Sequence, residues 1–230
     1  MLTEIKKNTD LWDRLFRETG FEPHGAGNEP VDTITVKGDV SLLIEPIRRP
    51  RIAVIGTRDI STYGVDAVNK IISALSMRAD RPVIISGLAF GVDVEAHRAA
   101  LALGLPTVAV LPTYVNEIYP KQHEHIATEI TAREGCCLLS QFKNKTAPMA
   151  INFLFRNNTI AHIADAVVVV ESKERGGAMV TARCAVDAGI PVFAVPGRMD
   201  DVRSAGCNSL IEQGVATILS RPEILTTYNF

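Results

Sequence analysis

The sequence predicts an α/β fold in which a doubly wound, mostly parallel sheet carries helices on both faces. Six apolar, strand-like runs alternate with helical segments from residue 50 onward, and such alternation is typical of βαβ units. The runs are almost continuously apolar, as parallel strands covered on both faces should be. They lie at residues 51–56, 82–86, 106–111, 136–140, 166–171 and 190–195.

The bulk composition is that of a globular protein with one large domain. Its 230 residues are 47% hydrophobic and 22% charged, which is enough chain to bury a substantial core. The formal net charge of −2 gives no general attraction to nucleic acid, so a nucleic-acid site would have to be a local basic patch. The densest group of cations surrounds the first strand and is either such a patch or a solvated edge. It comprises Arg48, Arg49, Arg51 and Arg58.

The elements outside the alternating region are shorter. Residues 3–19 have apolar side chains at near-helical spacing and are expected to form an N-terminal helix, followed by a turn-rich connector at 20–30. Short apolar runs at 33–36 and 42–44 predict a small hairpin or two edge strands. Residues 64–77 repeat apolar side chains at the spacing of one buried helical face. We expect an N-terminal helical segment with its connector, a main domain and a C-terminal tail, at 1–32, 33–220 and 221–230.

Cysteine usage and hydropathy predict a cytoplasmic protein. The four cysteines show no CxxC spacing and most adjoin apolar stretches, which suits reduced, buried thiols better than disulfides or a zinc site. No apolar stretch typical of a signal peptide follows the start, and no apolar run approaches the roughly 20 residues of a membrane span. His123 and His125 form an HxH pair without a third ligand nearby, so neither a metal nor a cofactor is predicted.

Three of the strand-like runs break into a small or polar turn that opens a helix. Because the carboxyl ends of neighbouring parallel strands meet at one edge of a sheet, these turns are expected to surround one crevice. Helix N-termini with glycine-exposed N–H groups, together with an arginine, make an anion pocket. The sequence therefore predicts a phosphate site. Its residues are Thr57, Arg58, Ser86, Gly87, Gly91, Gly176 and Gly177.

The motifs of common phosphate-dependent enzymes are missing. The turn after the first strand lacks GxGxxG spacing, the second turn reads GxxxG, and no GK[ST] follows a strand. Neither a Ser-His-Asp nor a Cys-His arrangement is indicated. A binding protein is therefore expected, and not an enzyme.

Two further groups of residues are candidates for the site. Asp93 and His97 lie four residues apart on one helix face. Either Asp93 orients the His97 imidazole toward the crevice, or Asp93 stabilises the helix N-terminus and His97 is a satisfied polar contact. Phe153 and Arg156 share one helical face with Asn152, so a ring and a guanidinium could stack on a base and bind phosphate. The alternative is that the aromatic residues of this segment belong to the core.

Taken together, the short motifs resemble one family. They are GTR at 56–58, YG at 63–64, SGLAFGVDVEAH at 86–97, YP at 119–120, FRNNTIAH at 155–162, GGAMVTA at 176–182, VPG at 195–197 and GCNSLI at 206–211. Each is weak alone, but in this order and spacing they strongly resemble the DprA/Smf family of DNA-processing proteins. The resemblance spans residues 33–218.

The resemblance implies a Rossmann-like domain that binds single-stranded DNA, forms a homodimer and helps to load the recombinase RecA during natural transformation. It also implies a DNA phosphate in the strand-end pocket. Phe153 would stack on a base and Lys145 would pair with a phosphate. The matching positions are Arg58, Ser86, Gly87, Gly91, His97, Arg156, Asn157, Gly176 and Gly177.

The chain also departs from the family pattern. The family usually has an arginine where Phe90 and Asn158 stand, so weaker DNA binding with a flatter salt dependence is expected, with Arg175 compensating in part. A nucleotide sensor or nucleotide-processing enzyme of a related Rossmann-like group remains the alternative. Its characteristic PGGxGT motif appears here only as RGGAM at 175–179. A third possibility is an interaction protein whose dimer surface is its function.

Overall fold

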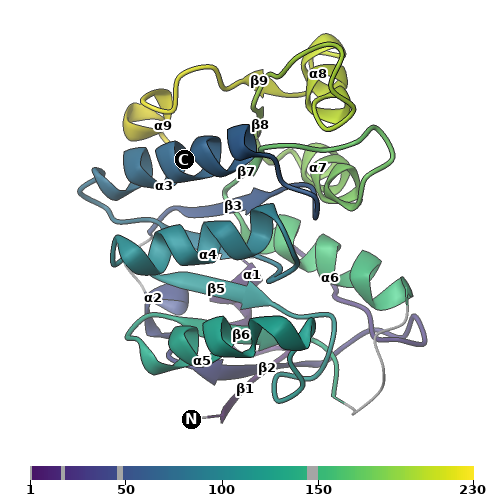
Figure 1. The fold of residues 1–230 in the computed structure, drawn as a ribbon. Helices are drawn as coiled ribbons and strands as arrows, with labels where there is room; N and C mark the ends of the chain where they lie inside the picture. The colour runs from purple at the N-terminus through teal and green to yellow at the C-terminus, as the bar shows by residue number, and fades with distance from the viewer. Residues whose placement is uncertain (1, 17–18, 46–48, 144–149) are drawn as a thin grey trace.

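The computed structural model describes residues 2–16, 19–45, 49–143 and 150–230, and there it shows a nine-stranded sheet between two layers of helices (Figure 1). The strand order is β1-β2-β6-β5-β4-β3-β7-β8-β9. Neighbouring strands from β6 to β9 run parallel, whereas β1 and β2 extend one edge in antiparallel pairs. The mostly parallel, Rossmann-like α/β fold predicted from the sequence is confirmed.

All six predicted parallel strands are present, each inside its predicted run. A short seventh strand, β9 at Thr217–Ile218, extends the sheet beyond β8 and was not predicted. The six strands are β3 (Arg51–Ile55), β4 (Val83–Ser86), β5 (Thr107–Val110), β6 (Cys137–Ser140), β7 (Ala166–Val169) and β8 (Val192–Ala194).

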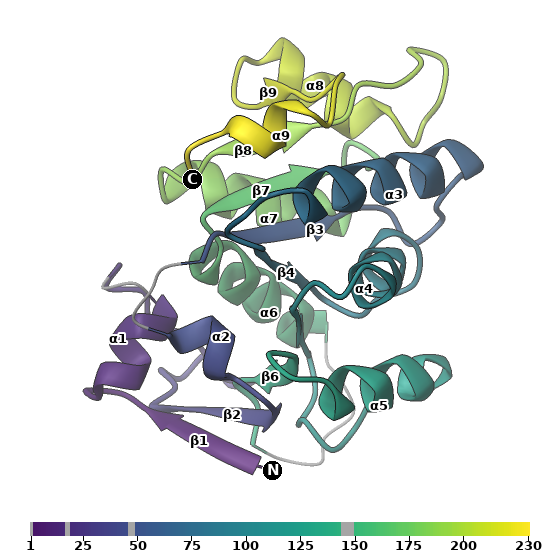
Figure 2. The ribbon, with the colours of Figure 1, turned by 90° about the vertical axis from the view of Figure 1, so that its left-hand side faces the viewer.

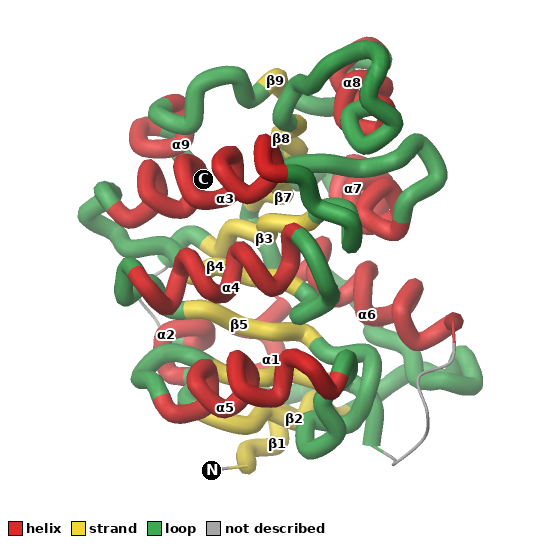
Figure 3. Tube along the Cα trace, viewed as in Figure 1, coloured by secondary structure: helices red, strands yellow, loops and turns green. Residues whose placement is uncertain are grey.

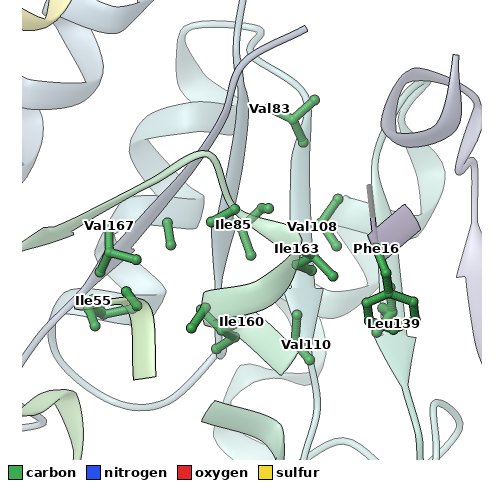
Figure 4. Close-up of a cluster of buried hydrophobic side chains, with 14 of the residues drawn as sticks. Phe16, Ile55, Val83, Ile85, Val108, Val110, Leu139, Ile160, Ile163 and Val167 are labelled. Atoms are coloured by element: carbon green, nitrogen blue, oxygen red, sulfur yellow. The ribbon is translucent and has the colours of Figure 1, made fainter. Parts of the chain in front are cut away.

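The central strands are apolar on both faces because each face carries a layer of helices. In β3, Ile52 and Val54 belong to one buried cluster, whereas Ala53 and Ile55 belong to the cluster on the opposite face. Side chains alternate across a strand, so a strand between two helical layers must be apolar at every position. Figure 4 shows side chains of the second cluster, among them Ile55 and, from the covering helix, Ile160.

The helices divide between the two faces as a doubly wound fold requires. One face carries α3, α4, α5 and α9, and the other carries α1, α2, α6, α7 and α8 (Figures 1 and 2). The bounds are α1 (Asp10–Phe16), α2 (Ser41–Ile44), α3 (Thr62–Ser76), α4 (Val92–Ala102), α5 (Glu124–Ala132), α6 (Ala150–Ile163), α7 (Gly177–Asp187), α8 (Ala205–Glu212) and α9 (Ile224–Thr227), with a 3₁₀ turn at Lys121–His123.

The N-terminal region differs from the prediction. Its helix is shorter than expected, because Leu2–Lys6 form strand β1, which pairs with β2 (Thr33–Gly38). The predicted second strand at 42–44 is instead part of the short helix α2, so no hairpin forms there. A three-residue apolar run fits a strand or one helical turn equally well, and packing on the sheet decides between them.

The three arginines around β3 that the structure describes do not form one patch. Arg51 is 4% exposed and lies at the amino end of β3, where its side chain donates to backbone carbonyl oxygens of three helices. Arg49 forms an ion pair with Glu45, and Arg58 lies at the opposite, carboxyl end of β3. Arg48 is outside the described residues. The described arginines therefore have three different surroundings. Arg51 is buried, Arg49 is ion-paired, and Arg58 lies at the carboxyl end of β3.

The C-terminal residues pack on the main domain. Arg78 of α3 donates to the carbonyl oxygens of Leu225, Thr226 and Tyr228, and its guanidinium lies 5.0 Å from the ring centre of Phe230. All four cysteines lie in the described part of the chain and are unpaired, as predicted. No helix among the described residues is long and apolar enough to cross a membrane.

The strand order reverses between β3 and β7. The chain runs outward from β3 through β4 and β5 to β6, and then returns along α6 to β7 on the other side of β3. The loops after β3 and β7 are green in Figure 3 and follow the two strands at which the chain changes direction. Ligands of open α/β sheets bind at such a switch point.

Candidate functional site

A cleft of about 450 Å³ occupies this switch point. Its walls come from the loop after β3, one face of α6, and the loop after β7 with the N-terminus of α7. The side chains and backbone that define it are Gly56, Thr57, Arg58, Asp59, Asp93, Phe153, Arg156, Asn157, Ser172, Lys173, Gly176 and Gly177.

The loop after β3 is held in place by hydrogen bonds to Glu171. The N–H of Thr57 donates to the backbone oxygen of Glu171 at 2.6 Å, and the buried Glu171 carboxylate accepts bonds from the N–H and the hydroxyl of Ser61. Gly91 packs against the same loop, where a Cβ would lie 2.2 Å from the Thr57 carbonyl oxygen, and its φ of +75° also favours glycine. These contacts fix the position of Arg58 at the mouth of the cleft.

Arg58 is exposed and lies over an aromatic ring. Its guanidinium carbon is 5.1 Å from the ring centre of Phe153, which projects from α6. The Arg156 guanidinium is 6.0 Å from the same ring. The pattern of a ring and a cation that the sequence indicated in this segment is therefore assembled at the cleft and is not part of the core.

Arg156 is buried with too few acceptors. It is 4% exposed, its Nε has no hydrogen-bond partner among the described residues, and its terminal nitrogen is 3.6 Å from a carboxylate oxygen of Asp93. Burial lowers the pKa of Arg156 and the Asp93 carboxylate offsets part of that fall, so the guanidinium stays charged at neutral pH. A buried arginine with five donors and one distant carboxylate favours an additional anion.

Asp93 and Gly87 both lie next to the terminal nitrogen of Arg156. The Gly87 N–H donates to Asp93 Oδ2 at 3.2 Å, and a Cβ on Gly87 would lie 1.1 Å from the Arg156 terminal nitrogen. Only glycine allows this close approach. Burial raises the pKa of the Asp93 carboxyl, and the Arg156 guanidinium offsets part of the rise. Asp93 therefore serves as the internal counter-ion of Arg156.

The N-terminus of α7 closes the cleft. Its N-cap, Gly176, makes no side-chain cap hydrogen bond, and a Cβ on Gly177 would meet open space. The first N–H groups of a helix have no intrahelical acceptor, and the helix dipole makes this end positive. Asn157 donates to the Gly177 carbonyl at 3.3 Å and so ties the loop to α6.

The charges of the cleft favour an anion, although the chain as a whole is acidic. Three cations, Arg58, Arg156 and Lys173, line it against the two carboxylates Asp59 and Asp93. This balance is a local excess of one positive charge before the α7 dipole is counted. The cleft therefore has the local positive charge that a nucleic-acid site would need in a chain with a negative net charge.

Several predicted site residues lie elsewhere. Ser86 is fully buried and does not line the cleft, and its hydroxyl donates to the Val54 carbonyl at 2.7 Å. Arg175 is exposed but does not line the cleft, whereas Lys173, two residues earlier, does. Lys145 is outside the described residues. Lys173 was missed although it stands in the same polar turn, a signal that could have identified it.

His97 does not face the cleft either. It is fully buried, and its Nδ1 lies 2.7 Å from the Thr107 hydroxyl. That hydroxyl donates its own hydrogen to the Ile84 carbonyl at 3.0 Å, so His97 Nδ1 carries the proton and donates. The Nε2 atom has no partner among the described residues. Of the two interpretations of His97, the structure supports the buried polar contact.

The burial of His97 predicts a loss of stability in mild acid. Burial lowers the pKa of His97 from 6.5 to about 3, and the charges of His123 and Arg156 add to the fall. The pKa of His97 is lower in the folded state than in the unfolded state, so protonation of this side chain favours unfolding. The free energy of unfolding is therefore unaffected by His97 above pH 6.5 and decreases as the pH falls toward 3. By pH 5 we expect a loss of about 2 kcal/mol.

Urea unfolding of the wild type and of His97→Gln at pH 7.5 and pH 5 measures this loss. The variant should lose about 2 kcal/mol less than the wild type over this interval, because glutamine does not titrate. The subtraction removes the contribution of other groups such as His162, whose pKa is also lowered by burial. Equal losses in the two proteins would contradict the assignment.

Comparison with known proteins places this geometry in a family. The family model for DNA recombination-mediator protein A matches residues 24–229. DNA processing protein DprA of Streptococcus pneumoniae is 36% identical over 194 residues, covering 84% of this chain and 66% of that protein. Protein Smf of Escherichia coli is 38% identical over 180 residues, covering 78% of this chain and 47% of that protein. The chain thus spans about half to two thirds of these relatives.

Solved structures give the same result. The crystal structure of DprA from Streptococcus pneumoniae matches with a TM-score of 0.84 and 31% identity, covering all of this chain and 75% of that one. DNA processing protein A from Helicobacter pylori, whose structure was described for its single-stranded DNA binding mode, matches with a TM-score of 0.79 and 26% identity over 98% of this chain and 94% of that one. With its motifs, its fold and its sequence in agreement, the chain belongs to the DNA recombination-mediator protein A family.

Proposed function

We propose that the protein binds single-stranded DNA in the cleft between β3 and β7. Neighbouring backbone phosphates would contact Arg58, Arg156 and the first N–H groups of α7. The observation that carries the proposal is the buried Arg156 guanidinium, which has an unpartnered Nε and lies in the same cleft as an uncapped helix N-terminus. A phosphate supplies the acceptor oxygens that this site lacks.

The proposal favours a single strand over a duplex. Phe153 lies at the cleft beside two guanidinium groups, and an aromatic ring can stack only on a base that is free of its own neighbours. In a duplex the phosphates are accessible but the base faces are covered. The described single-stranded DNA binding mode of the Helicobacter pylori relative supports this choice.

Family membership supports further parts of the proposal. We propose that the protein is a binding protein and not an enzyme, that it acts as a homodimer in the cytoplasm, and that its DNA-bound form assists RecA. Among the described residues, no group of three His, Cys, Asp or Glu side chains could hold a metal ion. We propose that the phosphate contact uses the cationic side chains of the cleft and the backbone N–H groups of α7.

The test is fluorescence anisotropy of a labelled oligothymidine over a range of salt concentrations. Each neutralised phosphate of a single strand contributes about −0.7 to the slope of log affinity against log salt, so Arg58, Arg156 and Lys173 predict a slope near −2. Affinity should fall roughly 15- to 20-fold between about 50 and 200 mM salt. Unlabelled oligothymidine should compete, whereas the matching duplex and free mononucleotides should not.

Two outcomes would overturn the proposal. One is the absence of binding at micromolar protein in about 50 mM salt. The other is competition by duplex as effective as that by the single strand. Strong competition by one mononucleotide would instead support a nucleotide ligand for the same cleft.

A further inference from the structure

A second, smaller hollow adjoins the cleft on the side of α4. It has a volume of about 30 Å³ and shares Arg58, Phe153 and Arg156 with the cleft. Its other walls differ in character from those of the cleft, because they are aromatic and apolar. They are Gly87, Ala89, Phe90, Pro112, Tyr119 and Pro120.

Two aromatic side chains at this hollow are partly exposed, and each packs against another ring. Phe90 is 43% exposed and Tyr119 is 42% exposed, a large apolar area to leave in water. Phe90 sets its ring against His123 with centres 4.7 Å apart, and Tyr119 sets its ring against Phe153 at 5.7 Å. His123 is itself fixed, because it is buried and its Nδ1 donates to the Leu88 carbonyl at 2.7 Å. The two rings are therefore held in position with part of their surface open.

The shared arginines determine what can occupy the hollow. Arg58 and Arg156 line both the cleft and the hollow, so an occupant of the hollow lies next to the anion in the cleft. Single-stranded DNA places a flat, aromatic base beside every phosphate. An apolar peptide side chain would fill the hollow but would leave the neighbouring guanidinium groups without acceptors.

We propose that Phe90 and Tyr119 form a nucleobase subsite, on which a base stacks when the phosphate next to it lies in the cleft. This inference rests on the proposed function and adds a second contact to it. Stacking on an aromatic ring accepts any base, because every base has a π face. The subsite also contributes to the choice of a single strand, since a paired base cannot reach the two rings.

The test separates stacking from charge. Phe90→Ala with Tyr119→Ala should weaken oligothymidine binding about 5- to 150-fold. The salt slope should stay unchanged, because no cation is lost. Leu103→Ala removes an apolar side chain of similar exposure, 44%, from the opposite end of α4, and serves as the matched control. Thermal melting of each variant checks that the fold is intact.

An abasic oligonucleotide of the same length supplies the second arm. The abasic oligonucleotide keeps the phosphates and lacks the bases. The loss of affinity from oligothymidine to the abasic oligonucleotide should therefore be larger for the wild type than for the Phe90 and Tyr119 double variant. Equal losses in the two proteins, or wild-type affinity of the double variant for oligothymidine, would overturn the subsite alone. Failure of the wild type to bind oligothymidine would overturn the proposed function and the subsite together.

Discussion

Replacing both Arg58 and Arg156 by alanine is expected to abolish binding of oligothymidine, with affinity lowered at least about 100-fold at moderate salt. The two guanidinium groups lie 5.1 and 6.0 Å from the centre of the Phe153 ring and are two of the three cations that line the cleft. Arg156 is buried, so its guanidinium attracts an anion strongly, whereas Arg58 is exposed and would contact the DNA at the protein surface. The salt slope should fall by about 1.4, the share of two phosphate contacts.

The controls separate loss of binding from loss of structure. Arg156→Ala leaves the buried Asp93 without its cation, so melting temperatures must accompany the affinities. Arg58→Ala alone changes an exposed side chain and should lower the slope by about 0.7 with no loss of stability. Arg98→Ala removes an exposed arginine of α4 that pairs with Glu95 at 3.9 Å, and should change neither quantity. Unchanged affinity of the folded double variant would refute the phosphate site.

Arg51→Met is expected to cause the largest loss of stability, roughly 3–5 kcal/mol in the free energy of unfolding. The Arg51 side chain lies where α1, α2 and α6 end. Carbonyl groups in the last turn of a helix have no intrahelical donor, and this end of the helix dipole is negative, so one buried cation stabilises three helix ends. Its acceptors are the backbone oxygens of Arg14 at 2.7 Å, Leu15 at 2.6 Å, Ile163 at 3.5 Å and Leu43.

Urea denaturation of the wild type, Arg51→Met and Arg98→Met measures this effect. Methionine keeps most of the side-chain volume, so the loss reports the missing donors and not a cavity. Arg98→Met should lie within about 0.5 kcal/mol of the wild type, since its ion pair is exposed. A loss below about 1 kcal/mol for Arg51→Met would show that the three helix ends are stable without the arginine.

The sequence alone determined the parallel core and the place of the cleft. Continuous apolar runs that alternate with helical segments indicate strands covered on both faces, and parallel strands bring their carboxyl ends to one edge. Arg58 after β3 and Gly176 and Gly177 after β7 therefore had to lie near one another, and the structure shows them lining one cleft. Two of the ordered motifs that identified the family begin at strand ends, GTR directly after β3 and SGLAFGVDVEAH at the last residue of β4.

Other features were decided only by tertiary structure, since they depend on contacts between residues far apart in the sequence. β1 contains few apolar residues and is a strand because it pairs with β2. Arg51 resembles a surface cation in the sequence, and it is buried because three helix ends meet around it. His97 and Arg156 both lie on apolar helices, yet His97 bonds to Thr107 inside the sheet whereas Arg156 reaches the cleft over Gly87. A local pattern specifies which face of a helix is buried, but which buried polar group finds a partner, and which is left for a ligand, depends on the elements packed against it.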